Sequence, residues 1–195
     1  MTEQEFVQFV KKECKYYGVK CRIGRGVYVR FTDGELSSGY FNDGKLELAV
    51  GGQNPNFLSI LAHEYCHMRQ WVEKADVWVK TNEEKSYLYW DKHLKGEKVE
   101  NMDYHYDLMR DLELDNEKRT VQLIKDLDLP INVREYTRKA NAYVMFYNYM
   151  KISGKWCRIP PYTCERLMAE LPDTFSMNYS KLSKKLETIF REENI

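Results

Sequence analysis

The residues best suited to chemistry lie at 63–67, where His63, Glu64 and His67 form an HExxH pattern. Histidines four apart on a helix project from one face, so both imidazoles can bind one tetrahedral zinc ion. A glutamate directly after the first histidine lies near the open coordination position, where it can take a proton from a metal-bound water and pass it to a leaving amine. The pattern therefore predicts a hydrolytic zinc centre with Glu64 as general base.

The same short pattern also has a purely structural interpretation, in which two partly buried histidines are satisfied by hydrogen bonds in the core. Its surroundings favour the metal site, because SILAHEYCHMRQW is an apolar, helix-forming stretch that follows a predicted β region. Cys66 points in a different direction from the two histidines, and we interpret it as a packing residue.

A zinc site of this kind needs a third protein ligand. The metzincin extension of the pattern requires a glycine and a histidine where this chain has Gln70 and Glu73, so that class is disfavoured. The remaining histidines, His93 and His105, lie in polar sequence and read more easily as surface residues.

Glu113 is the better candidate for the third ligand. In a helix predicted over residues 106–127, it projects within about 40° of the centre of the apolar face. A buried carboxylate needs a cation, and a zinc ion held by two neutral imidazoles would supply one. Glu117, one turn later, could accept the second ring N–H of a ligand histidine. The alternative is a surface helix whose two glutamates pair with Lys118 or Arg110.

HExxH on one helix, with a downstream ExxxD-like pair on another, resembles the gluzincin group of zinc metallopeptidases. The resemblance implies that His63, His67 and Glu113 bind Zn²⁺, that Glu64 is the general base, and that Glu117 stands where the group often has aspartate. The stretches LELDNEKRTVQLI and ANAYVMFYNYMKISGKW are also similar to uncharacterised metallopeptidase-like proteins of tailed phages. The gluzincin resemblance implies hydrolysis of peptide bonds in a peptide or protein substrate, whereas the similarity to the phage proteins brings no established substrate.

The elements that must position these residues can be read from the spacing of apolar residues. The sequence predicts a helix over residues 3–17 that ends at Gly18, and then short, partly alternating strands up to residue 50 that form an antiparallel meander. Asn54 and Pro55 supply a cap and a first-turn proline for the helix that carries the HExxH pattern. Residues 74–103 are a helical excursion or a long loop. Asn132 with Glu135 forms a capping box that opens another long helix.

These elements predict an α+β, zincin-like fold, in which a small antiparallel sheet packs against a mostly helical domain with the HExxH helix at its centre. We expect one domain over residues 1–195. Residues 1–53 form its N-terminal helix and meander, residues 54–154 its metal-site helices, and residues 155–195 a C-terminal packing segment. The strand KLELAV is either a sheet edge that could pair with an extended peptide or an interior strand.

Charge and cysteine content limit the expected partners and compartment. Thirty basic residues balance thirty acidic ones, so no overall field would draw the chain to nucleic acid or to a membrane surface. The chain shows neither a signal peptide nor a segment of membrane-spanning length, and its five cysteines are an odd number. We therefore expect a cytoplasmic protein with reduced thiols, and a monomer. The pairs Cys14 with Cys21 and Cys157 with Cys164 could alternatively hold a second metal.

Two other functions stay open at this point. The chain could be a binding or regulatory protein that keeps zinc without cleaving anything, although a purely structural site has no need of Glu64. The same centre could also hydrolyse a non-peptide bond. Tyr136, Tyr143 and Tyr147 share a helical face, where they either pack in the core or line a cleft in which one phenol stabilises an oxyanion.

Overall fold

The computed structural model describes residues 1–31 and 34–195, and its fold is mixed α and β, as the sequence predicts. Two compact units divide the chain. The first unit contains Met1–Ala75 and Arg119–Asn132, and the second unit contains Asp76–Lys118 and Val133–Ile195. Helix α5 (Met102–Asp126) runs continuously from one unit into the other. No helix within the described ranges has both the length and the apolar character needed to cross a membrane.

The first unit is built on a three-stranded sheet in the order β1-β5-β4, formed by β1 (Lys20–Gly24), β5 (Glu47–Gly51) and β4 (Gly39–Asn42). β4 is antiparallel to β5, but β1 is parallel to it, so the predicted antiparallel meander is wrong. The reason is the intervening chain, which forms a separate antiparallel pair, β2 (Val29–Arg30) with β3 (Leu36–Ser37), before β4 and β5 are added. The predicted strand KLELAV, which overlaps β5, is therefore central and not an edge.

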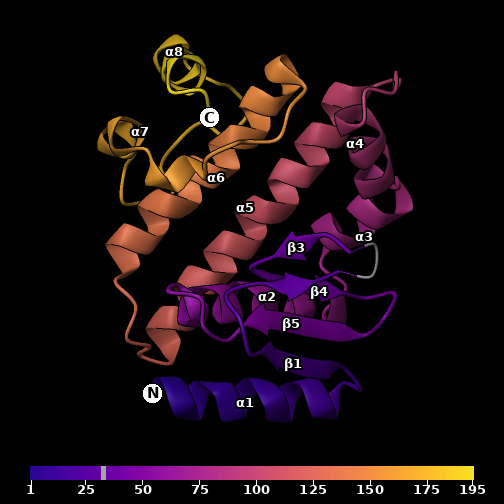
Figure 1. Ribbon diagram of the computed structural model, residues 1–195, viewed down its shortest axis with the longest axis vertical. Coiled ribbons are helices and arrows are strands. Elements are labelled where there is room, and N and C mark those ends of the chain that lie inside the picture. The colour runs from indigo at the N-terminus through magenta and orange to yellow at the C-terminus, as the bar shows by residue number, and fades with distance from the viewer. Residues whose placement is uncertain (32–33) are drawn as a thin grey trace. The chain divides into compact units, whose positions relative to one another are not determined.

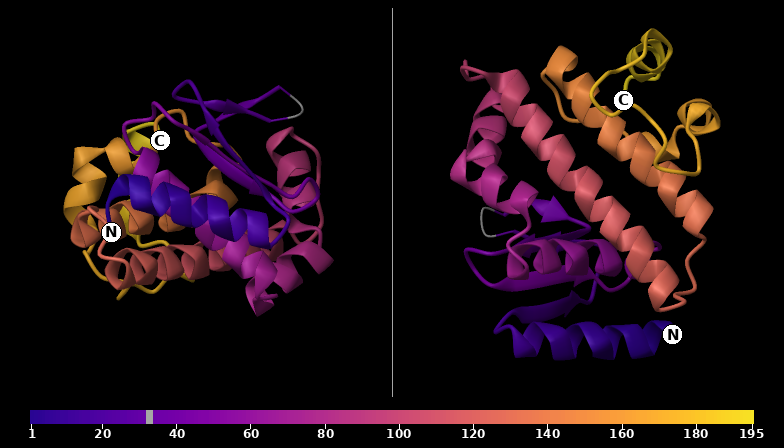
Figure 2. Two further views of the ribbon diagram at one scale, coloured as in Figure 1. Left: turned by 90° about the horizontal axis from the view of Figure 1, so that it is seen from below. Right: turned by 180° about the vertical axis from the view of Figure 1, so that it is seen from behind.

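Two helices cover this sheet. α1 (Glu3–Tyr16) packs on β1, and α2 (Phe57–Val72) packs across β4 and β5, as Figures 1 and 2 show. α1 is followed by Gly18 at φ +72°, a left-handed conformation that ends a helix and favours glycine.

The predicted cap of α2 is wrong by two residues. Asn54 Oδ1 accepts the Asn56 N–H at 2.9 Å, which makes a turn ahead of the helix, and Asn56 is the capping residue.

One carboxylate at the sheet surface has an unusually rich set of donors. Glu47 on β5 accepts a hydrogen bond from the Tyr40 hydroxyl at 2.5 Å and one from Arg22 Nε at 3.2 Å, and its ion pair with Lys20 also spans 3.2 Å. Burial alone would raise the pKa of Glu47, but the hydrogen bonds from these three side chains outweigh it and lower the pKa to about 2. The cluster ties all three strands of the sheet together.

The second unit is helical. It contains the part of α5 up to Lys118 and six further elements: α3 (Asp76–Glu83), α4 (Ser86–Leu94), α6 (Val133–Ser153), the 3₁₀ turn η1 (Pro161–Thr163), α7 (Glu165–Glu170) and α8 (Lys184–Glu192). Residues 74–103, predicted as a helical excursion or a loop, therefore supply two helices. Tyr106 and Met109 of α5 pack with Phe146 of α6 and Phe190 of α8 in one buried cluster.

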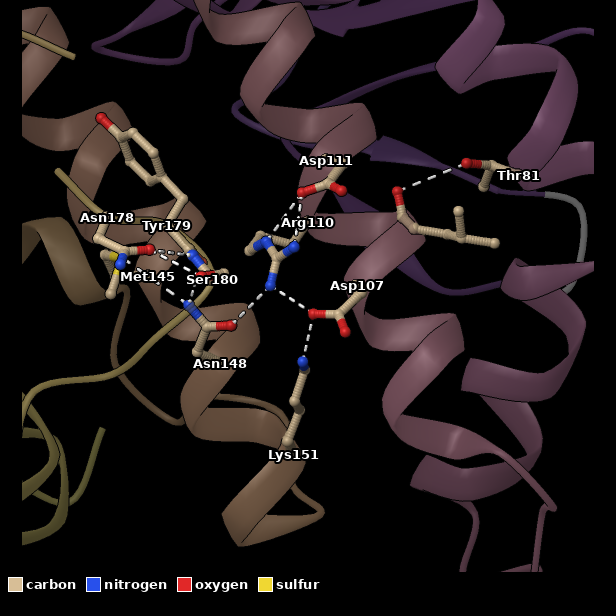
Figure 3. A network of polar contacts seen from close by, with 11 residues as sticks. Thr81, Asp107, Arg110, Asp111, Met145, Asn148, Lys151, Asn178, Tyr179 and Ser180 are labelled. Atoms are coloured by element: carbon tan, nitrogen blue, oxygen red, sulfur yellow. Dashed lines mark hydrogen bonds and ion pairs between the residues drawn. The ribbon is translucent and has the colours of Figure 1, made fainter. Parts of the chain in front are cut away.

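A polar network within the second unit fixes α5 against α6 (Figure 3). The Arg110 guanidinium, whose side chain is only 6% exposed, binds Asp107 and Asp111 on its own helix and donates to Asn148 Oδ1 of α6 at 3.1 Å. Lys151 of α6 binds the same Asp107. The network sets how α5 lies on α6, and so which α5 residues face the α6 tyrosines.

Candidate metal centre

Helix α2 positions the HExxH residues within the first unit. The helix runs unbroken from Phe57 to Val72, so His63 and His67 lie one turn apart, with ring centroids 4.7 Å apart and ring planes at 84°. Glu64 and His67 are 8% and 7% exposed. This helix also buries Leu61, Ala62, Tyr65 and Met68, and that apolar packing holds the polar side chains in place.

Gln70 lies against His67 on the same helix. Its amide oxygen is 2.9 Å from His67 Nδ1, and the Gln70 side chain is completely buried. A carbonyl oxygen can only accept a hydrogen bond, so this contact is a hydrogen bond when Nδ1 carries the ring proton. In a neutral imidazole that leaves Nε2 as the nitrogen with a lone pair, the form in which histidine binds a metal.

Gly39, the first residue of β4, lies against Glu64. A β-carbon added at Gly39 would be 2.6 Å from Ile60 Cγ2, 3.1 Å from Glu64 Cγ and 3.2 Å from Glu64 Oε1. The 2.6 Å contact is shorter than real β-carbons show and the other two are tight, so a larger residue here would force Ile60, Glu64 or the strand to shift. Because Gly39 has no side chain, the Glu64 carboxylate can lie beside the strand.

Helix α5 carries the two glutamates, and both are buried, each 5% exposed. This agrees with the inward direction that the helical pattern predicts for Glu113. Glu117 accepts a hydrogen bond from the Tyr136 hydroxyl at 2.6 Å within the second unit. Arg110, the alternative partner considered for these carboxylates, binds Asp107 and Asp111 instead.

His63, His67 and Glu113 each offer one possible ligand atom, and these three atoms all lie within 4.8 Å of one another. Such a group could hold a metal ion. Among the residues that the structure describes, it is the one group of three or more such side chains, so the cysteine pairs form no second site there. The five cysteines are free thiols.

The expectation that His105 is a surface residue is wrong. It is 6% exposed, and its Nδ1 lies 3.1 Å from the Ser86 hydroxyl oxygen. The polar sequence around it belongs to α4 and to the start of α5, which pack together and cover the ring. Burial also lowers the pKa of His105, although Glu84 opposes this. His105 is therefore a satisfied core histidine of the second unit.

The charge of Glu113 contributes to the raised pKa of two phenols on α6. The hydroxyls of Tyr143 and Tyr147 lie 3.5 Å apart. Burial raises the pKa of both phenols well above its usual range, and the negative charge of Glu113 raises it further. Both groups therefore stay protonated and keep a hydrogen to donate. Tyr147 is buried in the core and Tyr143 is partly buried against it.

The sequence alone predicted His63, Glu64, His67 and Glu113 as site residues, but it missed Gln70 and Gly39, which lie against two of them. The spacing of three between His67 and Gln70 was visible, since such residues are neighbours on a helix. Nothing in the sequence marked Gly39, because its role depends on β4 passing over α2. No protein-family model, curated protein or solved structure matches this chain.

Proposed function

We propose that the chain is a zinc-dependent metallopeptidase of the gluzincin type, in which His63, His67 and Glu113 hold Zn²⁺ and Glu64 is the general base. The observation that carries the proposal is the convergence of three possible ligand atoms within 4.8 Å of one another. Glu64 is next to the first of these residues on α2.

The donor set fits zinc. Two imidazoles and one carboxylate are the protein ligands of many catalytic zinc sites, which leave a fourth position open, whereas structural sites fill all four positions with protein ligands. When bound, Zn²⁺ would polarise a substrate carbonyl and promote ionisation of water. The Gln70 hydrogen bond supports this assignment, because it leaves a lone pair on Nε2 of His67.

The chain's own groups account for the proton movements of peptide hydrolysis. The Glu64 carboxylate, seated beside Gly39, takes a proton from the attacking water and delivers it to the departing amine. Tyr143 and Tyr147 remain neutral donors and do not compete as bases, because their pKa values are raised. The choice of a peptide bond as substrate rests on Glu64 and on the gluzincin resemblance.

The first test is the zinc content of the purified protein, measured by elemental analysis. We expect about one zinc per chain in the wild type and a large loss in His63→Ala and in Glu113→Gln, because each substitution removes one of three ligands. His93→Ala and Glu97→Ala are matched controls that remove a histidine and a glutamate elsewhere. Unfolding curves of the metal-free proteins separate lost ligation from lost folding. Unchanged zinc in both ligand variants would refute the metal site.

The second test separates catalysis from metal binding. Glu64→Gln removes the base without removing a ligand, so this variant should keep its zinc and lose about 10²–10⁴-fold in cleavage of a peptide library. A wild type that binds zinc and cleaves no member of the library would favour a non-catalytic zinc protein instead. Cleavage that survives in Glu64→Gln would exclude Glu64 as the base.

A further inference from the structure

Gln70 lies where it can control the orientation of the His67 ring and the position of the ring proton. Both side chains are buried on α2, and one hydrogen bond of 2.9 Å joins the amide oxygen to Nδ1. The Gln70 backbone is fixed as well, since its carbonyl accepts the Ala75 N–H at 2.9 Å where the helix ends. A glutamine held in this way restricts rotation of the imidazole and determines which ring nitrogen carries the proton.

The chemistry of the two groups determines which one donates the hydrogen bond. If the other ring nitrogen carried the proton, Nδ1 and the amide oxygen would face each other with two lone pairs, and a buried acceptor pair of that kind is costly. The Nδ1–H form is therefore favoured by the contact itself, before any metal arrives. Partners that orient a ligand histidine in this way typically contribute 10–100-fold to metal affinity.

We propose that Gln70 is a positioning residue for the metal centre, which orients the His67 ring and holds it in the tautomer whose Nε2 is available to a divalent cation. The assignment rests on the proposed function, because His67 is a ligand only if the site binds metal. It goes beyond that function by naming a residue that neither binds the ion nor touches the substrate.

The first measurement uses the metal-free wild type and needs no variant. Long-range ¹H–¹⁵N correlation of the histidine rings should show the proton of His67 on Nδ1. A His67 ring protonated on Nε2 would overturn the inference whatever the protein does with zinc.

The second measurement is Zn²⁺ affinity, obtained by competition with a chromogenic chelator. Gln70→Met keeps the length of the side chain but removes the strong acceptor, and it should bind Zn²⁺ about 10–100-fold more weakly. Gln70→Glu keeps an acceptor oxygen and should rescue the affinity to within a few-fold of the wild type. Arg69→Met is the matched control, because the neighbouring Arg69 side chain binds Glu13 and Glu73 instead of His67.

The outcomes separate the two proposals. A wild type without affinity for Zn²⁺ refutes the metal site itself. A wild type that binds Zn²⁺, together with a Gln70→Met variant that folds and binds it equally well, refutes only the role of Gln70. If Gln70→Met does not fold, a Gln70→Glu variant with the affinity of the wild type and an Nδ1–H ring supports the role, and loss of either overturns it.

Discussion

The substitution Gly39→Ala tests the close approach of β4 to the Glu64 side chain. The added methyl group would lie 2.6 Å from Ile60 Cγ2 and 3.1 Å from Glu64 Cγ, so both side chains or the strand must move. Overpacking of this kind typically costs about 1–3 kcal/mol of stability. Replacing glycine also restricts the unfolded chain, which returns about 0.4–1 kcal/mol. We expect a net destabilisation of about 1–2 kcal/mol.

Urea unfolding of the metal-free protein measures this loss, and Gly26→Ala is the matched control. A β-carbon at Gly26 would meet only the Tyr28 carbonyl oxygen at 3.8 Å, so that variant should be as stable as the wild type or up to about 1 kcal/mol more stable. Ile60→Ala removes the nearest atom, and in a double-mutant cycle it should relieve part of the cost of Gly39→Ala. Equal stability of Gly39→Ala and Gly26→Ala would refute the reasoning.

The remaining predictions concern charged side chains. Because the folded pKa of Glu47 is lowered to about 2 from 4.5, its contribution to stability is complete above pH 4.5 and is lost as pH falls toward 2. Glu47→Gln should therefore reduce the free energy of unfolding by about 1–2 kcal/mol at pH 7 and by less at pH 3, as urea titrations at both pH values would show. Arg110→Met should cost about 2–3 kcal/mol in thermal unfolding, because it removes charge-assisted hydrogen bonds to Asp107, Asp111 and Asn148. A change below about 0.5 kcal/mol would show that Arg110 is dispensable.

Local patterns predicted the helices and the burial of the candidate site better than they predicted the sheet. Helical spacing placed Glu113 on an inward face, and it is buried, because a helix fixes side-chain directions through its own periodicity. The parallel pairing of β1 with β5 joins residues as far apart as Lys20 and Glu47, and no local pattern encodes that register. His105 was misread because its burial depends on α4, which the sequence left open as an excursion or a loop, packing against the start of α5.

The α6 phenols also set an alkaline limit on the folded state. Tyr143 and Tyr147 ionise near pH 10 in an unfolded chain, but burial keeps them protonated in the folded protein well beyond that point. Above pH 10 the unfolded chain therefore holds fewer protons than the folded one, and each further rise in pH favours unfolding. Buffers for storage and for column regeneration should stay below that pH, because strong base destabilises the folded second unit through these buried phenols.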